Sequence, residues 1–250
     1  MNTIEVENDW LKQLLPEGFP YPTSTLISGP GGTGKPLIEF AFVASWLKSG
    51  GSIIGVPLQY PTIEFVKTVL NKLYNVDLKD YQSKVAMIQL DPHIDGLEPL
   101  EDNIIKANIV KPEVWNEAVE KADSMIEKGN IGTMVFGSAL NLLIFSPTYK
   151  NSVVENIDNI LKNDKSKTYI FSVSTTVFLD EIELWEKSAD NLMFTEMDKS
   201  VKLLFKISRM KGVSFSKEEI SVPISQTALM DIKDIAEIMR KKTIPEIKSI

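Results

Sequence analysis

The stretch Gly29-Pro30-Gly31-Gly32-Thr33-Gly34-Lys35-Pro36 decides how this chain is interpreted, because four of the 13 glycines of the chain fall there. Residues 25–28 before it predict a short apolar strand, and residues 36–47 after it carry apolar side chains at helical spacing. Glycines let a backbone turn with its N–H groups facing inward, and a helix N-terminus adds positive potential. Lys35 is placed to reach a β- or γ-phosphate. The stretch therefore predicts a phosphate-binding loop.

Outside this loop, short apolar runs alternate with amphipathic segments. The apolar runs predict strands at residues 25–28, 52–56, 84–90, 132–136, 168–173, 191–196, 201–208 and 219–224. The amphipathic segments predict helices at residues 36–47, 61–73, 112–128, 152–161, 177–188 and 228–242. Alternating strands and helices favour a parallel sheet covered on both faces, and the last three strands follow one another as an antiparallel edge. We expect an α/β fold and one domain over residues 1–250, with a lead-in at 1–20 and a C-terminal helical extension at 227–250.

Composition excludes several classes of function. The chain has no cysteine and a single histidine, His93, which excludes disulfides, thiolate metal sites and a cysteine nucleophile. Its 27 basic and 34 acidic residues give a net charge of −7, which disfavours binding to nucleic acid through bulk charge. The longest apolar stretch, residues 131–145, is shorter than the ~20 residues of a membrane span. The acidic N-terminus does not have the pattern of a signal peptide, and we expect a cytoplasmic protein without a membrane span.

Two segments fall outside the alternating pattern. Residues 91–111 are predicted to be a long solvated connection, and their acidic side chains do not have a regular spacing for a divalent cation. Those side chains are Asp91, Asp95, Glu98, Glu101 and Asp102. The helix predicted at 228–242 is expected to pack on its own domain, with docking to a partner as the alternative.

From about Leu14 to Ser225 the sequence resembles the KaiC-like branch of the RecA superfamily of P-loop ATPases. The resemblance rests on four motifs, which are Leu14-Leu15 with Gly18-Phe19-Pro20, the glycine loop, Ala189-Asp190-Asn191-Leu192, and Ser208-Arg209-Met210-Lys211-Gly212. It implies a RecA-like fold, with a mostly parallel central sheet, helices on both faces, antiparallel strands at one edge and an extra C-terminal helix.

The resemblance also implies roles for particular residues. ATP would be bound by the loop residues Gly29, Gly31, Gly32, Thr33, Gly34 and Lys35. Arg209 and Lys211 lie in a turn that, in similar proteins, reaches the nucleotide of a neighbouring subunit in a ring. Two solvated charges at the end of a hairpin are the alternative for this pair.

The sequence departs from the family pattern at four places. Pro36 stands where a hydroxyl would bind magnesium, and Gly137 and Ser138 follow the strand that would end in aspartate. Leu58 and Gln59 stand where similar proteins carry a pair of glutamates. Residues 172–176 offer only Ser172, Ser174, Thr175 and Thr176 as weak phosphate sensors. We therefore predict neither catalytic residues nor metal ligands, and we consider magnesium binding doubtful.

Three interpretations of the function are open at this point. The first is a degenerate KaiC/RecA-like ATPase homologue with a regulatory or scaffolding role, with a protein partner or self-association, weak or no hydrolysis, and residual nucleotide or anion binding. The second is an active ATP-hydrolysing switch in which Ser138 or Asp91 replaces a lost ligand. The third is a recombinase-like accessory protein in DNA repair, which the net charge of −7 disfavours.

Overall fold

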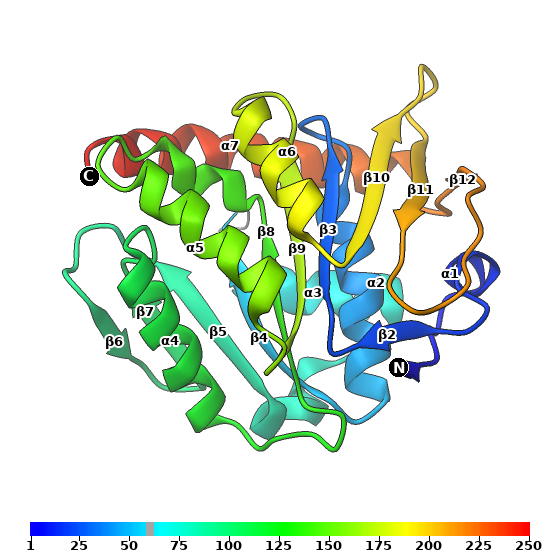
Figure 1. Cartoon of the computed structure of the whole chain (residues 1–250), viewed down its shortest axis with the longest axis horizontal. Coiled ribbons are helices and arrows are strands. Elements are labelled where there is room, and N and C mark those ends of the chain that lie inside the picture. The colour runs from blue at the N-terminus through cyan, green and yellow to red at the C-terminus, as the bar shows by residue number, and fades with distance from the viewer. Residues whose placement is uncertain (59–62) are drawn as a thin grey trace.

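The computed structural model describes residues 1–58 and 63–250, and Figure 1 shows one sheet between two layers of helices. The helices are α1 (Asp9–Leu14), α2 (Lys35–Lys48), α3 (Ile63–Tyr74), α4 (Pro112–Met125), α5 (Lys150–Asn163), α6 (Leu179–Ser188) and α7 (Gln226–Lys248), with 3-10 turns η1 (Leu78–Lys84) and η2 (Leu140–Phe145). The strands are β1 (Asn2–Ile4), β2 (Phe19–Tyr21), β3 (Ser24–Gly29), β4 (Ser52–Pro57), β5 (Val85–Leu90), β6 (Leu97–Pro99), β7 (Ile104–Ala107), β8 (Thr133–Ser138), β9 (Thr168–Ser174), β10 (Asn191–Met197), β11 (Leu203–Arg209) and β12 (Ile220–Ser221).

In the described residues the main sheet has ten strands in the order β12-β11-β10-β3-β9-β8-β4-β5-β7-β6. The strands from β10 to β7 are parallel to one another. Strands β11 and β12 form the antiparallel edge that the sequence predicts. The expected α/β fold, a mostly parallel sheet with a C-terminal helix, is therefore confirmed.

Two hydrophobic clusters, one on each face of the sheet, hold the helices in place. Side chains of a strand alternate between faces, so neighbouring residues of β8 and β9 enter different clusters. Phe136 of β8 makes an edge-to-face contact with Phe40 of α2 on one face. Phe171 of β9 makes one with Trp115 of α4 on the other face. The central strands are buried on both sides, which explains why they read as continuous apolar runs.

The segment 91–111 differs from its prediction as a loop. It contains β6 and β7, with β7 parallel to β5 and β6 antiparallel to β7, so the second edge of the sheet also ends in an antiparallel strand. Strands of three or four residues carry too few apolar positions to show a period of two. Within the described residues, no group of three His, Cys, Asp or Glu side chains is placed to hold a metal ion.

The observed bounds of several other elements also differ from the predicted ones. The lead-in contains β1, α1 and β2, which were not predicted, and the strand expected at 219–224 is reduced to Ile220–Ser221. The helix predicted at 61–73 is described from Ile63 to Tyr74, and Gln59 lies outside the described residues. The search for spans that reach across a lipid bilayer finds none among the helices of the described residues.

Helix α7 is longer than predicted. It lies across the ends of the parallel strands, on the side of the sheet where β3 ends (Figure 1). The Ser225 hydroxyl caps its first turn by accepting from the N–H of Ala228. Leu229 and Ile232 near its start are buried in the α2-side cluster, and Ile247 near its end is buried in the other cluster. The helix thus packs on its own domain and spans both halves of the core.

Candidate functional site

The glycine loop connects β3 to α2, as the sequence predicts. Gly32 and Gly34 have φ values of 78° and 64°, in the left-handed region that favours glycine. A Cβ at Gly29 would stand 2.3 Å from the carbonyl oxygen of Thr195, so only glycine fits there. The backbone turn of a phosphate-binding loop is therefore present.

Lys35 lies inside this loop instead of pointing to solvent. Its ammonium donates hydrogen bonds to the carbonyls of Gly29 (2.9 Å) and Pro30 (2.6 Å) and to the hydroxyl of Thr33 (3.3 Å). Burial lowers the pKa of Lys35 to about 7, against a smaller opposing effect of the nearby Glu39 carboxyl. Lys35 thus closes the loop on itself and must turn outward to contact a phosphate.

Some backbone donors of the loop remain available to an anion. The N–H of Gly31 donates to the Thr176 hydroxyl at 3.1 Å. Within residues 1–58 and 63–250, the N–H groups of Gly32, Thr33 and Gly34 donate to no acceptor. Successive free N–H groups at a helix N-terminus form a concave site that favours negative charge.

Glu39, one turn after Lys35, is a buried carboxyl that the sequence analysis did not single out. Its side chain is 0% exposed, and neither oxygen has a hydrogen-bond partner of good geometry in the described residues. Burial raises the pKa of Glu39 to about 8, against smaller opposing effects of the nearby Ser172 hydroxyl and Lys35. A lone acid in the otherwise apolar run 37–44 was the signal available in the sequence.

The end of β8 presents Ser138, and not Gly137, to the loop side of the sheet. Phe136 faces α2, so Ser138, two residues later, shares that face. A Cβ on Gly137 would point the other way, 3.0 Å from Leu140 Cδ2 and 3.3 Å from Phe171 Cδ1. The Ser138 hydroxyl is buried and has no hydrogen-bond partner among the described residues.

A cavity of about 580 Å³ opens between the loop and helix α7. Polar and charged groups of the loop, of α7, of η2 and of the end of β9 line it, among them Gly31, Asn141, Ser174, Thr176, Lys233 and Arg240. This volume falls within the range of about 300–1,000 Å³ that is usual for sites of small molecules. Of the predicted loop residues, Gly31 and Gly32 line the cavity, while Thr33 and Lys35 are buried behind it.

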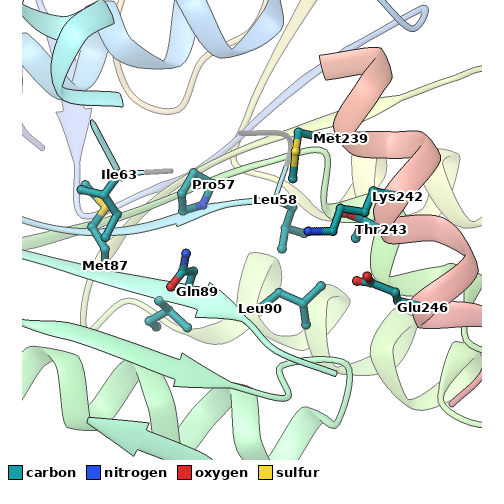
Figure 2. Close-up of a pocket in the computed structure, with 11 residues that line it drawn as sticks. Pro57, Leu58, Ile63, Met87, Gln89, Leu90, Met239, Lys242, Thr243 and Glu246 are labelled. Atoms are coloured by element: carbon teal, nitrogen blue, oxygen red, sulfur yellow. The ribbon is translucent and has the colours of Figure 1, made fainter. Parts of the chain in front are cut away.

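A smaller cavity of about 150 Å³ lies on the other flank of α7, at the ends of β4 and β5. Figure 2 shows Leu58 and Lys242 pointing toward one another across it, with Gln89 and Leu90 on the strand side. Leu58 is one of the residues that stand at the position of the expected glutamates. The described lining of this cavity includes no residue of the glycine loop.

Comparison with known proteins agrees with this geometry. A KaiC-like protein from the archaeon Pyrococcus horikoshii superposes with a TM-score of 0.66 at 15% identity, over 90% of this chain and 96% of the other. The flagellar accessory protein FlaH from Methanocaldococcus jannaschii gives 0.63 at 17% identity, with the same two coverages. The chain has the fold of the KaiC-like proteins. No protein-family model and no curated protein matches its sequence.

Within this KaiC-like fold, the residues beside the loop do not fit the magnesium ion that normally accompanies a triphosphate. Pro36 occupies the first turn of α2 and has neither hydroxyl nor N–H. The end of β8 supplies the hydroxyl of Ser138 instead of a carboxylate. Glu39, which has the nearest unpartnered carboxyl in sequence, is fully buried and lines neither cavity described above. Magnesium prefers carboxylates and phosphate oxygens, and this side of the site offers none of the former.

Arg209 and Lys211 lie away from their own loop, toward the opposite end of the strands, where β10 begins. Arg209 pairs in register with Leu192 on β10, and the N–H of Lys211 donates to Asn191 at the start of that strand. Arg209 also donates to two carbonyls at the end of α6, those of Glu186 and, at 2.8 Å, Ala189. Lys211 forms an ion pair with Asp190 at 2.8 Å. A role toward a neighbouring subunit stays a prediction, and both cations have partners within the chain.

We expect Arg209→Ala to lower the free energy of unfolding by about 1–2 kcal/mol, because two carbonyls at the C-terminus of α6 lose a charged donor. ATP affinity should change by less than about twofold, since Arg209 is remote from the loop of its own chain. Urea denaturation and calorimetric titration measure the two quantities. Unchanged stability together with weakened ATP binding would show that Arg209 acts on a neighbour's nucleotide.

Proposed function

We propose that this chain is a cytoplasmic regulatory or scaffolding protein of the KaiC-like fold that binds a nucleotide or another phosphate-bearing anion and hydrolyses it weakly or not at all. One observation carries the proposal. The loop keeps free N–H donors and Lys35, whereas Pro36 replaces the hydroxyl at the first turn of α2. Binding and turnover need different parts of such a site, and the chain retains the parts for binding.

The chemistry of phosphoryl transfer supports this separation. Catalysis of the transfer comes mainly from positioning and from neutralising charge with a metal ion. A glycine loop can hold phosphates through its N–H groups without a metal ion. A chain with Pro36 and Ser138 at the two metal positions is therefore expected to bind phosphates better than it transfers them.

We expect calorimetric titration to show ATP binding whose dissociation constant changes by less than about threefold on adding magnesium, since the metal has no protein ligand here. Lys35→Ala should weaken binding by about tenfold or more, because a buried ammonium beside the loop is lost. Lys67→Ala, which removes an exposed lysine of α3, serves as the control. Turnover of ATP by the purified protein should stay near the uncatalysed background.

Measured ATP turnover also distinguishes the proposed function from its main alternative. Substantial magnesium-dependent turnover that Lys35→Ala abolishes would identify an active ATP-hydrolysing switch. The unpartnered hydroxyl of Ser138 is the observation that favours this second candidate. Self-association is proposed by analogy with the similar fold, and sedimentation with and without ATP would test it.

A further inference from the structure

We propose that helix α7 completes the anion site in cis, so that Lys233, Arg240 and Asn141 bind a small molecule bearing two or three phosphates between this helix and the glycine loop. This inference rests on the proposed function. It adds the class of ligand, names the residues of α7 and η2 that bind it, and states that binding needs only one copy of the chain. Four observations support it.

Helix α7 is seated directly on the glycines of the loop. A Cβ at Gly34 would stand 3.0 Å from Leu229 Cδ2, and one at Gly32 would stand 3.3 Å from Lys233 Cε. A Cβ at Gly31 would stand 3.7 Å from Arg240 Nη1. Three successive regions of one helix therefore contact the loop, and the missing side chains of the glycines make room for them.

The helix turns cations toward the cavity. Lys233 and Arg240 are seven residues apart and share one face of α7, with Glu237 and Lys241 beside them. Lys241 is paired with Glu237 at 2.9 Å. Among the described residues, neither Lys233 nor Arg240 has a carboxylate within ion-pair distance. Lys233, Arg240 and Lys241 against Glu237 leave the cavity wall with a net charge of +2, in a chain whose net charge is −7.

Asn141 supplies a donor that has no acceptor within the described residues. Its side-chain oxygen accepts a hydrogen bond from the N–H of Ser174 at 2.9 Å, which fixes the orientation of the amide. Asn141 is only 4% exposed and lines the cavity, and its Nδ2 group donates to no acceptor in residues 1–58 and 63–250. This donor is therefore open to the cavity, and a ligand oxygen can accept from it without displacing a protein acceptor.

The hydroxyls of Ser174 and Thr176, 3.0 Å apart, lie between Asn141 and the loop. Together with the free N–H of Gly32 they place donors on the same cavity wall as Lys233 and Arg240. The cavity of about 580 Å³ has room for a chain of two or three phosphates against these groups. All of these groups belong to one chain, while Arg209 and Lys211 are remote from it, so binding does not require a second copy.

Calorimetric titration of the full chain with ATP and with inorganic tripolyphosphate tests the proposal. We expect both probes to bind, with Arg240→Ala and Lys233→Ala each weakening binding by about 5- to 10-fold. Lys242→Ala is the matched control, because it removes the same charge from the same helix but lines the other cavity. Its effect should stay below about twofold. Arg240→Gln, which keeps the length of the side chain, should behave like Arg240→Ala.

Several results would overturn this inference, and they separate it from the proposed function. If Lys35→Ala weakens binding but the Arg240 and Lys233 variants behave like Lys242→Ala, the site does not include α7 and the proposed function stands. Tighter binding by the α7 variants would mean that this helix excludes anions. Failure of the unaltered chain to bind either probe would reject both proposals. Affinity that rises with protein concentration would show that a second copy is required.

Discussion

Gly137→Asp is expected to destabilise the protein by about 4 kcal/mol or more, because the new carboxylate would be buried without a partner. The substitution is the obvious one for restoring an acid to the end of β8. The Cβ at position 137, however, points at Leu140 and Phe171, inside the apolar cluster on the α4 and α5 side of the sheet. The acid would therefore weaken the fold and could not reach the loop.

Gly137→Ala provides the control for this prediction, because it adds the Cβ without the charge. Leu140 Cδ2 would be 3.0 Å away and can shift, so we expect a loss of only about 1–2 kcal/mol. Urea denaturation of both variants measures the difference. A stable Gly137→Asp protein with magnesium-dependent ATP turnover would contradict the orientation of β8 described above.

Glu39→Gln is expected to stabilise the protein by about 2–4 kcal/mol at pH 7, and by less than about 1 kcal/mol at pH 5. Burial raises the pKa of Glu39 to about 8, from its ordinary value of 4.5. The folded chain therefore keeps a proton that the unfolded chain releases above pH 4.5. Stability falls as the pH rises between these two values, and the amide variant, which stays neutral, does not show this fall.

Lys35 changes the pH dependence of stability in the opposite direction, and it does so at higher pH. Its pKa is lowered to about 7 from 10.5, so the folded chain loses a proton that the unfolded chain keeps. Stability therefore rises with pH between about 7 and 10.5, in both the unaltered chain and the Glu39→Gln variant. Together the two groups place a minimum of stability near pH 7 to 8, where their contributions to the slope cancel.

Urea denaturation at a series of pH values measures these slopes. Glu98→Gln, at an exposed position, is the control, and its effect should stay below about 0.5 kcal/mol at every pH. If Glu39 were ionised and paired with Lys35, Glu39→Gln would instead destabilise the protein by about 3 kcal/mol, because a buried lysine would lose its counter-charge. The sign of the change at pH 7 thus decides the state of Glu39.

Local patterns in the sequence predicted the parts of the fold that depend on neighbouring residues. The strand before Gly29, the helix after Lys35 and the order of the long elements all follow from periodicity and from glycine and proline positions. Periodicity did not detect β6 and β7, which are too short to show a pattern. Pairing with β5 stabilises β7, and pairing with β7 stabilises β6.

Features that depend on contacts between distant segments could not be predicted in this way. The sequence suggested Gly137 and Ser138 together for the end of a strand, but only the packing of Phe136 on Phe40 shows which of them faces the loop. The position of α7 on the glycines depends on Leu229 and Ile247 entering different clusters. Its cations, Lys233 and Arg240, were not singled out by the sequence analysis, because their position beside the loop depends on this packing.

The anchoring of α7 at both ends has a kinetic consequence. Leu229 and Ile232 are buried at one end, Ile247 is buried at the other, and Ser146 donates to the carbonyl of Ile250 at 3.1 Å. The helix cannot swing away from the loop without exposing apolar side chains at one end or the other, which makes its detachment a local unfolding event. Escape of a bound molecule should therefore be slow and should share its temperature dependence with amide hydrogen exchange in residues 226–248.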